Sequence, residues 1–151
     1  MTEHLIAHPG DTIAIASDHA GVDLKAMLTR DLKEMGFKVL DLGTATTESV
    51  DYPDFGHALA RSIEDKKAKA GIAICGTGIG ISIAANRHPG VRAALVHDQT
   101  TARMAREHND ANIIAMGARV VPEGDARELI RTFFLTRFEG GRHQRRVEKL
   151  G

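Results

Sequence analysis

Residues 72–82 join the chain's only cysteine to a run of glycines, where an apolar strand is expected to meet a turn. The segment reads Ile-Ala-Ile-Cys-Gly-Thr-Gly-Ile-Gly-Ile-Ser, so Cys75 directly precedes Gly76. Glycines let backbone N–H groups converge on negative charge, and a helix start adds unpaired N–H groups and a positive dipole end. The segment therefore predicts a potential base beside a potential anion site, at a strand end of the kind where ligands bind.

Two familiar phosphate-binding motifs do not fit this turn. A P-loop needs a Gly-Lys-Ser/Thr sequence, and none follows at the required spacing. A dinucleotide-binding turn is closer, because Asp98 ends the next strand where a ribose-binding acid would stand, but Ile81 occupies the place of the third glycine. Two interpretations remain, a site for a small anion or oxyanion and a tight turn without a ligand.

Cys75 likewise has two interpretations, because a buried and inert cysteine is the commoner case in proteins. A helix N-terminus favours a reactive thiolate, and Thr77 could hydrogen-bond the sulfur or a substrate oxygen. A single cysteine excludes an intramolecular disulfide and any multi-cysteine zinc or iron–sulfur site. The histidines other than His19 and His108 show no metal-ligand spacing such as HExxH, so the sequence predicts no metal.

Other polar groups fall at predictable edges of the expected sheet. Asp18 and His19 follow the first strand, which places them at the same edge as Cys75, and Asp18 is also a good N-cap. The segment 108–110 ends a helix just before the last strand, at the opposite edge. His108 is then either a helix-terminal contact or, if catalytic, a residue that serves a site on a neighbouring subunit.

Several arginines follow the last predicted strand. Exposed arginines are usually solvated charge, but a group of them near Gly140 and Gly141 suits a phosphate clamp. The group comprises Arg119, Arg142, Arg145 and Arg146.

Composition limits the class of protein. With 151 residues, 42% of them hydrophobic, we expect one domain over 1–151, with an N-terminal extension at 1–11 and a polar tail at 139–151 that leaves the domain or packs on a partner subunit. Lys and Arg total 20 and Asp and Glu total 20, so no overall field favours nucleic acid or a membrane. Without a signal-like or membrane-spanning apolar run, we expect a cytoplasmic protein.

Apolar runs alternate with helical patterns along the chain. Strands are predicted at 12–16, 37–40, 72–74, 92–96 and 112–116. Helices are predicted up to Gly36, after Pro53, and at about 82–87, 100–108 and 126–138, the last with Asp125 as N-cap. This alternation predicts an α/β protein, a Rossmann-like three-layer α/β/α sandwich with a five-stranded parallel sheet.

Six ordered motifs together resemble the ribose-5-phosphate isomerase B family, from about Thr12 to the C-terminus. They are Ser17-Asp18-His19-Ala20-Gly21, Asp51-Tyr52-Pro53, the segment from Cys75 to Asn86, His108-Asn109-Asp110, Gly117-Ala118-Arg119 and Glu139-Gly140-Gly141-Arg142-His143. The resemblance implies a reversible aldose–ketose isomerisation of ribose 5-phosphate, a step of the pentose phosphate pathway, without metal or other cofactor.

The resemblance also implies roles for residues. Cys75 would move the C2 proton, His108 would open the sugar ring, and the glycine loop would hold the enediolate. We take Cys75, His108 and Thr77 as candidate catalytic residues. Substrate contacts are expected from Asp18, His19, Gly76, Thr77, Gly78, Ile79, Gly80, Asn109, Arg119, Arg142 and Arg146. Arg145 falls between the positions that match the family, so it is left out. One family branch replaces the cysteine with a glutamate later in the loop, but that position here is Ile81.

Family members build each site from two subunits, so the resemblance implies a homodimer or homotetramer with shared sites, which agrees with the expected place of His108. Alternatives remain for the substrate, including allose 6-phosphate, galactose 6-phosphate and a tetrose phosphate. The galactose-phosphate branch divides its site over two different chains, whereas this chain carries a full set. A non-catalytic sugar-phosphate sensor is the alternative from another class.

Overall fold

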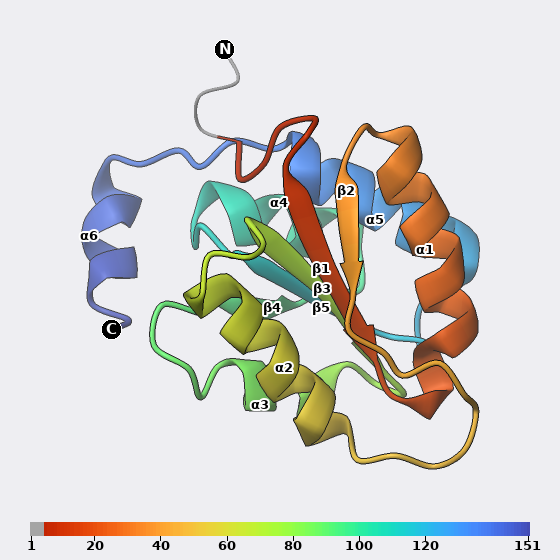
Figure 1. Cartoon of the computed structure of the whole chain (residues 1–151). Helices are drawn as coiled ribbons and strands as arrows, with labels where there is room; N and C mark the ends of the chain where they lie inside the picture. Colours follow the sequence, from red (N-terminus) through yellow and green to blue (C-terminus); the bar gives the residue numbers. More distant parts are fainter. Residues whose placement is uncertain (1–4) are drawn as a thin grey trace.

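The computed structural model of the chain describes residues 5–151 and centres on a five-stranded parallel sheet. The strands β1 (Thr12–Ser17), β2 (Lys38–Asp41), β3 (Ala70–Cys75), β4 (Ala93–Leu95) and β5 (Ile113–Gly117) lie in the order β2-β1-β3-β5-β4. The helices are the 3-10 turn η1 (His19–Gly21), α1 (Val22–Glu34), α2 (Tyr52–Glu64), α3 (Ile79–Ala85), α4 (Gln99–Glu107), α5 (Glu123–Leu135) and α6 (Arg142–Glu148). Every strand pair is parallel, and helices flank the sheet (Figure 1), which confirms the predicted sandwich.

The two faces of the sheet carry side chains of different size, because alternate strand residues point to opposite sides. Ile13 and Ile15 pack with α1, α4 and α5, whereas Ala14 and Ala16 lie on the face that α2 and α3 cover. Each fully buried isoleucine contributes about 1.5–3 kcal/mol. The alanine face lets α2 and α3 approach closely, and Cys75 belongs to that face.

Local sequence signals explain where α1 ends and where η1 begins. Gly36 follows α1 with a φ of +93°, which confirms the glycine stop predicted there. Asp18 accepts a hydrogen bond from the backbone N–H of Ala20 at 2.9 Å and so caps η1, as expected.

Two predicted helix starts are wrong, because both helices begin about three residues earlier than predicted. Helix α5 begins at Glu123 with Pro122 as its N-cap, so Asp125 lies within its first turn. Helix α3 begins at Ile79 instead of near Ser82, and the glycine loop therefore leads directly into it.

The two ends of the chain pack differently. Ala7 is buried, and the N–H of Gly10 donates to the carbonyl of Gly36 at 2.9 Å, so residues 5–11 pack on the domain. Residues 1–4 of the predicted extension lie outside the described part. The tail forms α6, which Figure 1 shows set apart from the sheet, with His143 as its buried residue. Packing of this tail on a second subunit stays a prediction.

Within residues 5–151, no helix has the length and apolar character that crossing a membrane requires.

Candidate active site

Cys75 is the last residue of β3, and its sulfur is already hydrogen-bonded. The backbone N–H of Gly78 donates to Sγ at 3.1 Å, and the residue is only 4% exposed. Because β3 pairs with β5 in the register that sets Cys75 beside Gly117, the thiol lies at the carboxyl edge of the sheet. The thiol and the turn after it therefore form one unit, as the sequence predicts.

Gly78 holds this unit in place through its backbone. Its φ is +80°, and a Cβ there would lie 2.7 Å from Cδ1 of Leu95 and from the carbonyl carbon of Met116. Only glycine fits both the conformation and the space. The turn consequently rests against the backbone at the end of β5, which keeps its N–H groups close to the sulfur.

The Thr77 hydroxyl is not hydrogen-bonded to the sulfur, which was one of its two predicted partners. Its Oγ1 accepts a hydrogen bond from the N–H of Ile79 at 3.2 Å, because the side chain turns toward the start of α3. The residue is exposed, so its hydroxyl is still free to meet a substrate oxygen.

Arg119 and Tyr52 flank the glycine turn. A Cβ at Gly76 would lie 3.1 Å from Nη1 of Arg119. Arg119, which is predicted to bind phosphate, therefore lies beside the glycine turn of its own chain. A Cβ at Gly80 would overlap the ring of Tyr52, which is 42% exposed. Residue types and spacing alone did not identify Tyr52 as a site residue; the available signals were its place in the Asp51-Tyr52-Pro53 motif and its being the only tyrosine.

Asp18 and His19 adjoin the same edge. The N–H of Asp18 donates to the carbonyl of Ile74 at 3.1 Å, so it lies one residue from the thiol along β3. Nδ1 of His19 accepts from the N–H of Val50 at 3.1 Å. This bond assigns the proton of a neutral His19 ring to Nε2, which is then the available donor.

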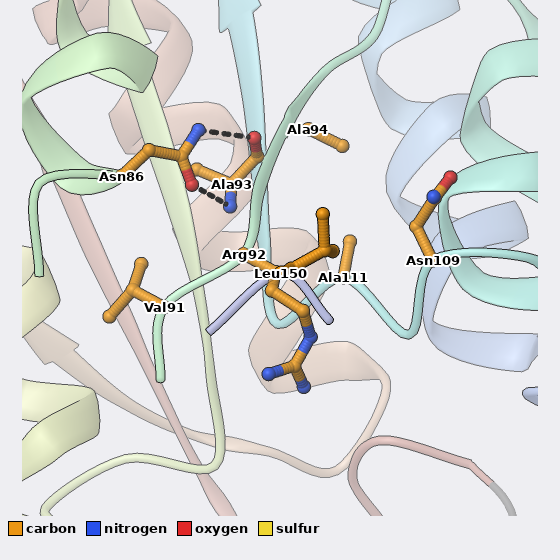
Figure 2. Close-up of a pocket in the computed structure, with 8 residues that line it drawn as sticks. All are labelled: Asn86, Val91, Arg92, Ala93, Ala94, Asn109, Ala111 and Leu150. Carbon is orange, nitrogen blue, oxygen red and sulfur yellow. Dashed lines mark hydrogen bonds between the residues drawn. The ribbon is translucent and has the colours of Figure 1, made fainter. Parts of the chain in front are cut away.

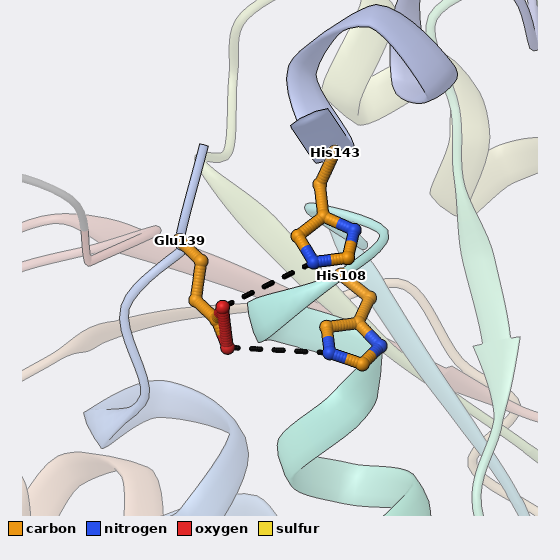
Figure 3. Close-up of side chains that lie close together, drawn as sticks. All are labelled: His108, Glu139 and His143. Carbon is orange, nitrogen blue, oxygen red and sulfur yellow. Dashed lines mark ion pairs between the residues drawn. The ribbon is translucent and has the colours of Figure 1, made fainter. Parts of the chain in front are cut away.

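A second group of polar side chains gathers around His108, which caps the end of α4. Nε2 of His108 lies 4.0 Å from Oε1 of Glu139, and Nε2 of His143 lies 3.9 Å from Oε2 of the same carboxylate. The two imidazole rings stack with centroids 4.3 Å apart and planes 16° apart (Figure 3). Burial lowers the pKa of His143, and the positive charges of Arg142 and Arg146 act in the same direction.

The turn that carries His108 and Asn109 is held by buried charge. Nη1 of Arg106 donates to Oδ1 of Asp110 at 2.8 Å and to the carbonyl of Ala111 at 2.7 Å. Asp110 has a φ of +46°, a conformation that asparagine and aspartate tolerate better than most residues. Arg106 is 1% exposed, so the position of this turn is tied to the core.

Asn109 lines a cavity of ≈ 460 Å³ that does not include Cys75. Figure 2 shows Asn86 across this cavity, where its side chain bonds both polar groups of Ala93 in the edge strand β4, at 2.9 and 2.7 Å. Leu150, from the chain end, lies against the same cavity. The cavity is therefore bounded by the β4 edge and the tail.

The predicted site residues thus form two groups. One surrounds Cys75 at the carboxyl edge of the sheet and the other surrounds His108, whose helix precedes β5 and so ends at the amino edge. The four residue steps from Ile113 to Gly117 correspond to about 13 Å of strand. A single chain does not bring the thiol and His108 within contact. Besides Tyr52, Glu139 and His143 also escaped identification from spacing, because their partner His108 lies some thirty positions away.

The chain is similar to known proteins over most of its length. Residues 13–150 match the family model described as Ribose/Galactose Isomerase. Ribose-5-phosphate isomerase B of Escherichia coli is 41% identical over 138 residues, 91% of this chain and 93% of the relative. The solved ribose-5-phosphate isomerase B structures of Clostridium thermocellum and Thermotoga maritima superpose with TM-scores of 0.91 and 0.90, at 51% and 47% identity. Each covers 93% of this chain, and the matches span 95% and 97% of the respective structures.

Proposed function

The chain belongs to the ribose/galactose isomerase family, and from this premise we propose that it interconverts ribose 5-phosphate and ribulose 5-phosphate as a step of the pentose phosphate pathway. The observation that carries the proposal is the Cys75 thiol seated in a glycine turn whose Gly78 N–H meets the sulfur at 3.1 Å. The names of the similar proteins favour the five-carbon substrate over the hexose phosphates.

Cys75 is the proposed base that removes the proton bound to carbon. Its thiolate removes the proton from C2 of the open-chain aldose, and the electron pair moves to the carbonyl oxygen to give an enediolate. The proton of the C2 hydroxyl moves to O1, and the thiol then returns a proton to C1, which completes the ketose. Backbone N–H groups of the turn from Gly76 to Gly80 stabilise the developing oxyanion, and the exposed Thr77 hydroxyl supports them.

His108 is the proposed ring opener. Ribose 5-phosphate closes to a hemiacetal, so opening requires a proton on the ring oxygen and removal of one from the anomeric hydroxyl. The His108 side chain is 38% exposed, so it can reach a bound sugar, and imidazole exchanges protons near neutral pH.

The remaining contacts divide by chemistry. Asp18, His19 and Asn109 suit hydroxyl groups or phosphate, and the N–H of Ile79 orients the Thr77 hydroxyl to which it donates. The guanidinium groups of Arg119, Arg142 and Arg146 suit the phosphate, because their planar donors match its oxygens.

Completing one site from both groups requires two chains, so we propose a homodimer, alone or paired into a tetramer. Cys75 of one chain would face His108 and the tail of the other. The separation of the two groups at opposite sheet edges supports this arrangement, as does the exposed position of α6. We also propose that the enzyme works in the cytoplasm.

Turnover on a series of sugar phosphates tests the substrate. The five-carbon phosphate should give the highest kcat/KM among aldose phosphates of four, five and six carbons. A higher value for allose 6-phosphate or a tetrose phosphate would replace the proposed substrate. Binding of ribose 5-phosphate without turnover would favour a sensor.

A further inference from the structure

Three potential metal ligands converge outside the glycine turn. The ligand atoms of His108, Glu139 and His143 all lie within 4.8 Å of one another. Figure 3 shows both imidazoles presenting a nitrogen to the same carboxylate. Two imidazoles and one carboxylate are also the ligand set of several catalytic zinc sites.

The backbone holds these ligands in register. The N–H of Glu139 donates to the carbonyl of Glu107 at 3.1 Å, which ties the start of the tail to the last turn of α4, next to His108. The N–H of His143 donates to the carbonyl of Gly140 at 3.0 Å. The stacked rings are nearly parallel, so one imidazole must turn out of the stack before both ring nitrogens aim at one ion.

We propose that His108, Glu139 and His143 form a binding site for a divalent transition-metal ion of the zinc class. Tetrahedral coordination at 2.0–2.2 Å would bring the ligand atoms to roughly 3.3 Å apart, from present separations of up to 4.8 Å, once one imidazole has turned toward the ion. His143 is buried while Glu139 and His108 are open to solvent, so a fourth position is left for water.

Two arginines set a limit on the affinity. The positive charges of Arg142 and Arg146 act on His143, and they would also repel a metal cation bound there. The site is therefore weaker than its ligand set alone would give. Replacing Arg146 by alanine should tighten zinc binding.

Metal binding has a consequence that rests on the proposed function. A metal bound to Nε2 of His108 removes the atom that would exchange the ring proton. Zinc would then block turnover of ring-closed ribose 5-phosphate, but it would leave hydrogen exchange at C1 of ribulose 5-phosphate, which has no ring to open. Bound zinc and ring opening would exclude each other, and a chelator would restore activity.

The test measures Zn²⁺ affinity of the full-length protein against a fluorescent chelator, with visible absorption of bound Co²⁺ reporting the coordination. Glu139→Gln and His143→Gln should each weaken zinc by about tenfold or more. His57→Gln is the matched control, because its Nδ1 meets Nε2 of His88 at 2.8 Å in a separate histidine pair. Cys75→Ser controls for thiolate binding, and both controls should bind zinc like the wild type.

Wild-type affinity in Glu139→Gln would overturn the site, and so would a loss of binding that follows Cys75→Ser instead. Glu139 is half exposed, so its variant remains informative if the buried His143→Gln fails to fold. The binding measurement uses no turnover, so its failure leaves the isomerase proposal intact. Zinc bound at these ligands without loss of turnover would retain the site and contradict the role of His108.

Discussion

The backbone N–H of Gly78 points at the sulfur of Cys75 and donates to it at 3.1 Å. Such a donor stabilises negative charge on sulfur, and the same residue is the N-cap of α3. The geometry of one glycine thus links the proposed base to the proposed oxyanion site.

Gly78→Ala should therefore damage both stability and activity. The positive φ and the 2.7 Å approach to the Met116 backbone predict a loss of about 1–3 kcal/mol in the free energy of unfolding. Urea denaturation measures this change. Gly124→Ala is the matched control, because a Cβ at Gly124 meets open space and alanine has a higher helix propensity than glycine. Equal stabilities of the two variants would refute the assigned role of Gly78.

His143 should titrate below the ordinary imidazole pKa of about 6.5, because burial disfavours its charged form. The unfolded chain then binds more protons, so this group makes the fold less stable as the pH falls below that value. Glu139 raises the pKa and Arg142 lowers it. NMR titration should accordingly give a lower midpoint in Glu139→Gln and a higher one in Arg142→Ala. Midpoints that move the other way would contradict the packing of the tail.

Arg142→Ala should raise the Michaelis constant for ribose 5-phosphate by about tenfold or more, since a charge-assisted contact to phosphate is worth roughly 1.5–3 kcal/mol. Arg145→Ala is its control, because Arg145 is exposed and has no proposed contact with the substrate. Steady-state kinetics on both variants separates the phosphate contact from the general charge of the tail. Equal effects of the two substitutions would count against the clamp.

Sequence patterns predict most of the fold. The β-branched runs locate all five strands, both the fully buried β3 and the only partly covered edge strands β2 and β4, because each run is continuous in sequence. They miss α6, since its one buried residue leaves no apolar stripe, and they misplace the start of α5, since its first turn is polar and exposed.

In the candidate site, contacts between residues close in sequence are predictable, and contacts between distant residues are not. Cys75 and the glycine turn are local in sequence, so their proximity is predictable. The stack of His108 on His143 joins residues far apart in the chain and depends on how the tail folds back. The contact of Tyr52 with Gly80 similarly depends on α2 packing against α3, which spacing does not encode.

Shared sites should be visible in mixed dimers. A heterodimer of a Cys75→Ala chain and a His108→Ala chain contains one site with both groups intact and one with neither. Such heterodimers should recover about half of the wild-type kcat, whereas each parent homodimer stays inactive. Tandem affinity tags isolate the heterodimer for the assay. An inactive, verified heterodimer would show that each site is built within one chain.

The most direct test of the account is exchange of the C2 hydrogen. Wild-type protein incubated with C2-deuterated ribose 5-phosphate should release deuterium to water as ribulose 5-phosphate forms, whereas Cys75→Ala should bind the sugar phosphate with little change and release almost none. Release by Cys75→Ala within a few-fold of the wild-type rate would contradict the assignment of Cys75 as the base.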